Sequence, residues 1–302
     1  MGTTHNHKHQ ITSTGTRLIL TMGLNFLITV AEIIGGIFSG SLSLISDALH
    51  NFSDGISVIL SYIALKLKSR ESTFKHTFGL KRAEILAAVI NSSVLIIISA
   101  YLFYEAAIRF INPEPVKSQI MMAVAFIGLL ANITGTLLLK RDSTGSLNIK
   151  SAYLHLLSDA VSSIAVLLGG AAIYFWNIYF VDPLLTILIG IYIIRESIVL
   201  LGKAVHVLME GAPDEISPEK IKLAVEKIEK VEDIHHLHIW TVGENDIHLE
   251  AHINIQDMMT SESDLLRNKI EMMLKSDFGI SHITIQFECD FCDSSNLIYN
   301  HK

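Results

Sequence analysis

Long apolar stretches separated by short polar connections dominate the first two thirds of the chain. Six of them are long enough to cross a hydrocarbon core of about 30 Å as helices. They cover 18–38, 42–67, 85–111, 120–139, 152–174 and 184–207. Arg195 and Glu196 interrupt the last stretch, and we expect their charged ends to reach the membrane surface along their apolar stems. The pattern predicts an all-α, six-helix transmembrane domain.

The pattern changes after Gly211-Ala212-Pro213. Apolar residues at helical spacing predict helices at 218–230 and 263–275, while alternation predicts strands at 234–242, 247–255 and around 283–287. This α-β-β-α-β order is typical of a small α+β domain, with a mainly antiparallel sheet and helices on one face. We therefore predict an N-terminal tail (1–16), a transmembrane domain (17–210) and a terminal α+β domain (211–302).

Basic residues indicate which side of the membrane holds the termini. An even number of spans puts both termini on one side, and the connections after the second and fourth spans are rich in Lys and Arg. These residues are Lys66, Lys68, Arg70, Lys75, Lys81, Arg82, Lys140, Arg141 and Lys150. The opposite side has little beyond Arg109 and Lys117. The positive-inside rule therefore predicts that the tail and the α+β domain are cytoplasmic.

Composition agrees with a membrane protein that carries a polar domain. Half of the residues are hydrophobic, 18% are charged and the mean hydropathy is +0.44, which excludes an ordinary soluble domain. Residues 1–210 hold 15 Lys and Arg against 12 Asp and Glu, whereas residues 211–302 hold 8 against 18. The two cysteines, Cys289 and Cys292, cannot form a disulfide scaffold and are interpreted as reduced thiols.

Two predicted transmembrane helices carry the same short motif, His-x-x-x-Asp. It occurs as His50 with Asp54 and as His155 with Asp159. Four residues correspond to about 400° of helical rotation, so each pair lies on one face, one turn apart. Two such helices facing each other can present two imidazoles and two carboxylates to one point, which is a complete tetrahedral set for Zn²⁺.

Polar residues satisfied within a helix bundle, or a proton relay without metal, are the simpler interpretations of this motif. A charge at the centre of a membrane helix costs about 2.5–3.5 kcal/mol or more, so four ionisable residues at matched spacing favour metal transport or binding. Asp47 lies on the same stripe as His50 and Asp54, toward the outer end. For Asp47, and for Glu32 and Asn25 on the first helix, interhelical hydrogen bonding and a role in the metal path both remain open.

Other protein classes fit the sequence less well. A membrane-tethered metal sensor or store would not need the buried four-ligand set. An intramembrane metalloprotease would need a catalytic glutamate beside its ligands, and the sequence contains no His-Glu-x-x-His, so we predict no enzyme. A passive channel would require weaker ion binding than four ligands provide.

The chain resembles the cation diffusion facilitator family, in particular its zinc-transporting branch. The resemblance rests on the paired motif, on Gly40-Ser41-Leu42-Ser43-Leu44 leading to Asp47-Ala48-Leu49-His50, on Phe78-Gly79-Leu80-Lys81-Arg82-Ala83-Glu84, and on the terminal domain. It implies a homodimer in the lipid bilayer that exchanges metal for protons by alternating access, with no nucleic-acid partner. The compact connections favour a bacterial inner membrane.

The resemblance also assigns the transport site to His50, Asp54, His155 and Asp159. Members that resemble manganese transporters have aspartate at the position of His50, so the imidazole favours zinc, with cobalt or cadmium as alternatives. The resemblance further puts Arg82 and Glu210 near the cytoplasmic waist of the dimer, where they would act in gating.

The terminal domain holds six histidines within 48 residues: His235, His236, His238, His248, His252 and His282. Of these, His235 and His252, together with Glu288, match a cytoplasmic metal site of the family, and we group His282 with them. Surface histidines of a polar domain are the alternative. Strand alternation would put His236 and His238 on one face and His235 on the other.

The chain ends suggest a third metal site. Cys289 and Cys292 offer two of the four ligands that a closed zinc site requires. His5, His7 and His9 could supply the rest, as the resemblance to some zinc-transporting members suggests. The alternative is a His-rich tail that only raises the local metal concentration.

Overall fold

A computed structural model describes residues 8–68, 71–140, 147–243, 246–289 and 296–298. The chain forms two compact units. The first comprises 1–62 and 90–201, and the second comprises 63–89 and 202–302. The first unit is built from helices, and the second contains the sheet.

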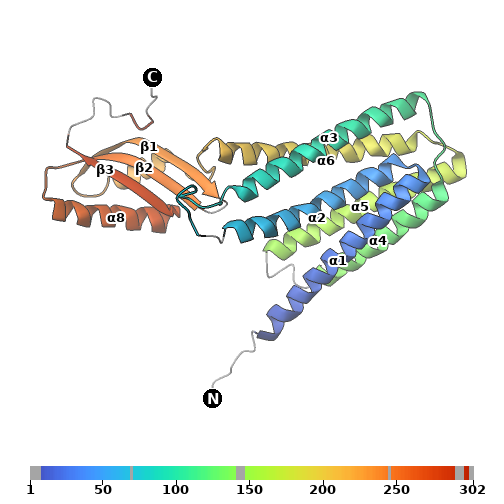
Figure 1. The fold of residues 1–302 in the computed structure, drawn as a ribbon, viewed down its shortest axis with the longest axis horizontal. Coiled ribbons are helices and arrows are strands. Elements are labelled where there is room, and N and C mark those ends of the chain that lie inside the picture. Colours follow the sequence, from blue (N-terminus) through green and yellow to red (C-terminus); the bar gives the residue numbers. More distant parts are fainter. Residues whose placement is uncertain (1–7, 69–70, 141–146, 244–245, 290–295, 299–302) are drawn as a thin grey trace, which may run out of the picture. The chain divides into compact units, whose positions relative to one another are not determined.

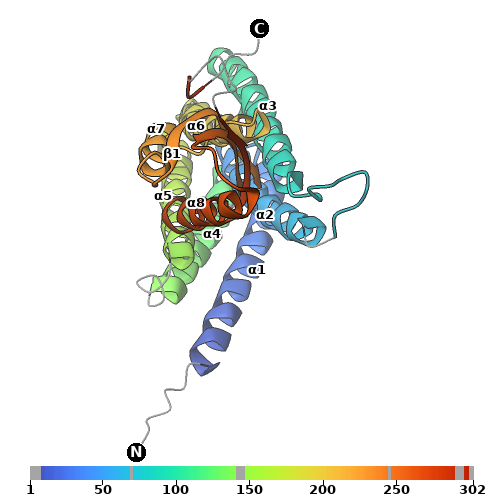
Figure 2. The same cartoon turned by 90° about the vertical axis from the view of Figure 1, so that its left-hand side faces the viewer.

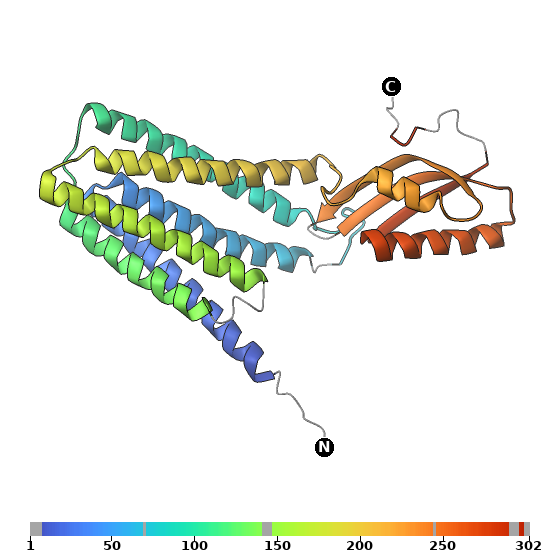
Figure 3. The same cartoon turned by 180° about the vertical axis from the view of Figure 1, so that it is seen from behind.

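The first six elements in chain order are long helices (Figure 1): α1 (Lys8–Ser39), α2 (Leu42–Lys68), α3 (Ala83–Ile111), α4 (Ser118–Lys140), α5 (Leu147–Trp176) and α6 (Val181–Leu208). In the first unit α4 packs along α5 and α1 packs along α4, as Figure 3 shows. Small residues allow this close approach. An added Cβ at Gly135 of α4 would lie 3.1 Å from side-chain atoms of Leu156 and Thr21.

Four of the six predicted spans are confirmed by length and composition. They are Ala83–Ile111, Ser118–Lys140, Tyr153–Trp176 and Val181–Leu208. The apolar part of α1 within the described residues, Gly23–Ser39, is shorter. Helix α2 is long but does not belong to these four, because one stripe of it carries Ser, Asp, His and Asn side chains.

Apolar clusters surround the start of α2. Leu44 packs with Met121 and Ala125 of α4 and with Val166 and Ile173 of α5. On another side, Leu42 packs with Leu102 and Ala106 of α3. These clusters hold the start of α2 between α3 on one side and α4 and α5 on the other.

A buried carboxylate from α6 caps α2. Asp182 is fully buried. Its oxygens accept hydrogen bonds from the Leu42 and Ser43 amides at 2.8 and 3.2 Å, and from the Ser41 and Ser43 hydroxyls at 2.6 Å each. The first amides of a helix lack intrahelical partners, and a negative charge there is favoured by the helix dipole. The Ser41 hydroxyl also accepts a hydrogen bond from the Leu44 amide at 3.2 Å, so Asp182, from a helix distant in sequence, adds to the local cap that Ser41 provides.

The second unit contains α7 (Pro218–Val225), β1 (Val231–Gly243), β2 (Asp246–Ile255), α8 (Thr260–Phe278) and β3 (His282–Glu288), in the predicted order. The sheet order is β1-β2-β3, with β1 and β2 antiparallel but β2 and β3 parallel. The prediction of a mainly antiparallel sheet is therefore wrong for the second pair. Helix α8 returns the chain to the starting end of β2, and such a crossover gives parallel strands.

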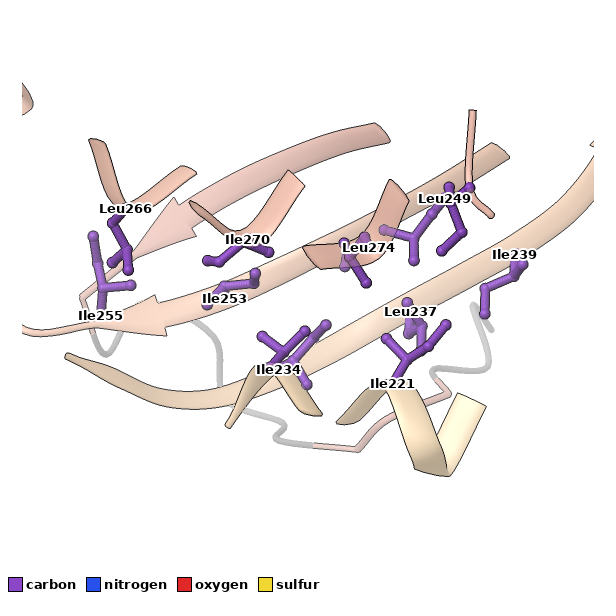
Figure 4. Packing of buried hydrophobic residues seen from close by; sticks show 13 residues of the cluster. Ile221, Ile234, Leu237, Ile239, Leu249, Ile253, Ile255, Leu266, Ile270 and Leu274 are labelled. Carbon is purple, nitrogen blue, oxygen red and sulfur yellow. The ribbon is translucent and has the colours of Figure 1, made fainter. Parts of the chain in front are cut away.

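One face of the sheet forms the core of this unit (Figure 4). Ile234, Leu249 and Ile253 from the strands meet Ile221 of α7 and Ile270 of α8. Both helices thus cover the same face, and Figure 2 shows them next to the strands. Each such buried side chain contributes about 1.5–3 kcal/mol as an upper estimate. The alternate positions of β2, which include His248 and His252, point to the opposite face.

Replacing Asp182 with Ala should destabilise the first unit by about 1–3 kcal/mol, because buried groups that bonded to a charged partner lose it. Thermal unfolding of the detergent-solubilised protein would measure this as a lower Tm. Asp257→Ala, which removes an exposed carboxylate, is the matched control. Equal melting temperatures for the two variants would contradict the capping role.

Candidate metal transport site

The four residues of the paired motif meet in the first unit. His155 Nε2 lies 3.1 Å from Asp54 Oδ2 and 3.5 Å from Asp159 Oδ2. His50 Nε2 lies 3.7 Å from the same oxygen of Asp54, and the two imidazole centroids are 5.7 Å apart. The ligand atoms of His50, His155 and Asp159 all lie within 4.8 Å of one another. Helices α2 and α5 thus bring together the side chains that the sequence predicts.

The facing atoms of these four side chains have no hydrogen-bond partner among the described residues. They are Nε2 of His50, Nε2 of His155, Oδ2 of Asp54 and Oδ2 of Asp159, and all four are buried. Buried polar atoms in proteins are normally satisfied, so their convergence requires an explanation. A divalent cation at their centre would satisfy all four, with the nitrogen and oxygen ligands that Zn²⁺ takes.

The site is not closed. The side chains of Asp54 and His155 are 37% and 34% exposed in the protein alone, whereas Asp159 is 2% exposed. The ring of Tyr192, on α6, packs edge-on against His50 with centroids 5.8 Å apart. An ion could therefore reach the ligands from one side while α6 covers another.

A polar layer continues from the site toward the start of α2. Asp47 accepts a hydrogen bond from Ser162 of α5. Glu32 of α1 accepts one from Asn51 at 3.1 Å, and a Cβ added at Gly128 of α4 would clash with its other oxygen. Both carboxylates thus make interhelical hydrogen bonds, which was one of the two interpretations of these residues.

A second cluster of candidate ligands lies in the second unit. Ligand atoms of His235, His252 and Glu288 lie within 4.8 Å of one another. Glu288 Oε2 is 3.3 Å from His235 Nε2, and Oε1 is 2.7 Å from His252 Nδ1. These residues come from the three neighbouring strands β1, β2 and β3. His235 pairs with His252, and Glu288 pairs with Asn254, two residues further along β2.

Two outer residues orient His235. Its Nδ1 lies 2.7 Å from Asp233 Oδ1, and Asp233 in turn accepts a hydrogen bond from Asn254 at 2.7 Å. A ring that donates from Nδ1 keeps the lone pair on Nε2, the atom that faces Glu288. Such carboxylate–histidine pairs fix the tautomer in metal sites, so this cluster also suits a metal.

His282 is separated from this group. In the parallel register it lies opposite His248, whereas His252 lies opposite Gln286. The centroids of His248 and His282 are 4.7 Å apart. The pairing of β3 therefore puts His282 beside His248 and not beside His252, which corrects the predicted grouping. The sequence alone does not specify this pairing.

His248 lies in a packed aromatic environment. Its ring centroid is 5.3 Å from that of Phe78 and 5.5 Å from that of Trp240. Burial, His282 and Lys81 together lower the pKa of His248, and Asp246 opposes them. At neutral pH this ring is therefore a neutral packing element.

Known proteins match the whole chain. A family model described as the cation efflux transmembrane domain matches residues 18–209, and one described as the cation efflux protein cytoplasmic domain matches 213–289. The chain belongs to the cation efflux family. It is thus an integral membrane protein of a transporter family, and the resemblance to cation diffusion facilitators is confirmed.

Several curated relatives are similar over nearly their full length. The chain is 35% identical to the zinc transporter ZitB of Pectobacterium atrosepticum, over 99% of this chain and 93% of that protein. It is 38% identical to a cadmium, cobalt and zinc/H(+)-K(+) antiporter of Bacillus velezensis, over 97% and 95%. ZitB of Escherichia coli is 33% identical, over 98% and 96%.

The two charges expected at the cytoplasmic waist are in contact within the second unit. Arg82 Nη2 lies 3.1 Å from Glu210 Oε1. The neighbouring Lys81 pairs with Asp246 at 3.2 Å. Two consecutive basic residues of the segment before α3 thus bind the turn that follows α6 and the start of β2.

The predicted terminal site lies largely outside the described residues. His5, His7 and Cys292 fall outside them, and the side chain of His9 is not described. Cys289 is a free, exposed thiol that follows Glu288 directly.

Sequence reasoning did not find several residues that complete the two sites. Tyr192, Asp182, Ser162 and Asp233 acquire their positions only through tertiary packing. A weak signal existed for two of them: Asp182 precedes a proline at a helix start, and Asp233 is two residues before His235 on one strand.

Reversing the charge of either Arg82 or Glu210 should reduce metal transport, and reversing both should restore it, because opposite charges again face each other. An exposed ion pair stabilises a fold by only about 0–1 kcal/mol, so each single variant should lower the transport rate rather than unfold the protein. Flux assays of Arg82→Glu, Glu210→Arg and the double variant would measure this. Two impaired singles without recovery in the double variant would argue against direct pairing.

Proposed function

We propose that this chain is a divalent-metal exporter, with zinc as its main substrate, and that the metal passes through His50, Asp54, His155 and Asp159. The observation that supports this most directly is the convergence of four buried ligand atoms that have no hydrogen-bond partner among the described residues. A permanent structural ion would not need the partly exposed Asp54 and His155.

Two imidazoles and two carboxylates favour zinc among the common divalent metals. Imidazole suits Zn²⁺ and Co²⁺, whereas an all-oxygen set suits Mn²⁺ and Mg²⁺. The names of the relatives support this choice of metals, since they include zinc, cobalt and cadmium. Cobalt and cadmium are therefore secondary substrates in this proposal.

The proposed counter-ion is the proton. Imidazoles bind metal only when neutral and carboxylates when ionised, so loading the site with protons releases the ion. The name of the Bacillus velezensis relative includes H(+)-K(+) antiport, which supports exchange. Alternating access would expose the site first to the cytoplasm and then to the other side.

The proposed setting is a homodimer with six spans per chain and both termini in the cytoplasm, in a bacterial inner membrane. The distribution of Lys and Arg supports the orientation, and the relatives named above are bacterial. The domain limits proposed from the sequence, 17–210 and 211–302, are kept.

The second cluster is proposed as a regulatory metal site in the cytoplasmic domain. His235, His252 and Glu288 would hold zinc there when its cytoplasmic concentration rises. The orienting bonds from Asp233 and Asn254 support a role for the cluster in retaining metal. Asp47 is proposed to line the metal path, and the terminal residues Cys289, Cys292, His5, His7 and His9 to form a further site.

Purified protein in zinc-free vesicles should take up Zn²⁺ faster when the lumen is acidic than when pH is equal on both sides. The proton gradient supplies the driving force, and a lumenal indicator dye measures initial rates. Asp159→Asn should remove most of this flux, because a neutral amide is a poor zinc ligand.

His206→Gln is the control, since this exposed histidine of α6 bonds to the Ala212 carbonyl and lies outside the site. Binding of zinc without any flux would identify a metal sensor or store instead. Zinc flux that does not depend on the pH gradient but depends on a potassium gradient would exclude the proton as counter-ion.

His50→Asp should keep the fold but shift selectivity toward Mn²⁺ or Cd²⁺, because a carboxylate replaces an imidazole. Since even outer-shell changes cost about 10–100-fold in metal affinity, zinc preference should fall by about tenfold or more in uptake competition. His206→Asp is the matched change at an exposed position. An unchanged zinc preference in His50→Asp would show that His50 is not a ligand.

A further inference from the structure

A β-bulge interrupts β1 beside the cytoplasmic cluster. His235 pairs with His252 and His238 pairs with Glu250, so His236 and Leu237 together face Ala251. Two residues against one define a bulge, which re-aims side chains. At its centre His236 has φ +47°, a left-handed conformation that is unfavourable for a residue with a Cβ.

The chain end supports this bulge. The His236 amide donates to the Asn296 carbonyl at 3.3 Å, and the Leu237 amide donates to the Leu297 carbonyl at 2.8 Å. These two amides at the bulge thus donate to backbone carbonyls of the segment that follows β3 in sequence. A strained conformation held by dedicated contacts indicates a functional position.

The bulge brings a third imidazole to the cluster. The ring centroid of His236 lies 4.8 Å from that of His252 and 5.4 Å from that of His235. Regular alternation would have put His235 and His236 on opposite faces. The bulge therefore overrides alternation at the position where it adds a potential ligand.

We propose that His236 is the fourth ligand of the cytoplasmic metal site, so that a single chain closes a three-histidine, one-glutamate site for Zn²⁺ or a similar ion. This rests on the proposed regulatory site. The ligand atoms of His235, His252 and Glu288 lie within 4.8 Å of one another, and the His236 ring lies next to both histidine rings. A closed four-ligand site retains its ion, which suits regulation better than transfer to the transport site.

Metal titration of the purified full-length protein tests this. Asp54→Ala and Asp159→Ala are included in every sample to silence the transport site. Co²⁺ reports coordination number, because its visible absorption is much stronger in four-coordinate than in six-coordinate sites, and Zn²⁺ competition gives the affinity. His236→Asn and His236→Gly both tolerate left-handed backbone and remove the imidazole.

Both variants should lose at least about tenfold in zinc affinity and most of the four-coordinate absorption, without a lower Tm of the metal-free protein. His238→Asn is the matched control, since this histidine lies two residues further along the same strand and pairs with Glu250. It should match the parent in both measurements.

Three results would overturn the proposal. If His252→Ala removes the site but both His236 variants match the parent, the regulatory site stands with three ligands and only His236 is excluded. If affinity falls only together with the Tm of the metal-free protein, His236 is structural. If His252→Ala also leaves the site intact, the regulatory site itself fails.

Discussion

The helical unit depends on keeping four ionisable side chains among apolar helices. Each pair is fixed within its own helix by the four-residue spacing, but the distance between the pairs is set by the packing of α2 against its neighbours. Leu44 and Leu42 hold the start of α2 through apolar contacts, and Asp182 binds its first turn. The candidate metal ligands are therefore positioned by residues six or more places away in sequence.

The two candidate metal sites use similar ligands under different constraints. In the cytoplasmic cluster, His235 is fully buried and its ring is fixed through Asp233 and Asn254. In the transport site, the side chains of Asp54 and His155 are about one third exposed, and no outer carboxylate is recorded on either imidazole among the described residues. An ion is released faster from ligands that can move than from ligands held by a second layer of bonds. This difference agrees with the roles proposed for them, passage at the first site and retention at the second.

Sequence reasoning succeeded where a short-range period determines the geometry. The His-x-x-x-Asp motif predicted four side chains that the structure brings together, because helical rotation fixes which residues share a face. Sequence reasoning failed where strand register or backbone conformation determines the position of a side chain. The placement of His282 follows from the parallel pairing of β3, and the turn of the His236 ring follows from a bulge that alternation cannot predict. Four of six spans were clear from apolar length, while α2 is too polar on one stripe for that criterion.

Because the start of α2 donates hydrogen bonds to Asp182 of α6, this helix can tilt about its start as a lever does. With its start fixed to α6, any tilt of α2 moves each residue in proportion to its distance from Leu42. At 1.5 Å per residue, His50 lies about 12 Å and Asp54 about 18 Å along the axis. A tilt of about 10° would displace them by ~2 Å and ~3 Å, comparable to a metal–ligand bond length. A small angular change at a fixed fulcrum is thus sufficient to break one ligand contact before the other.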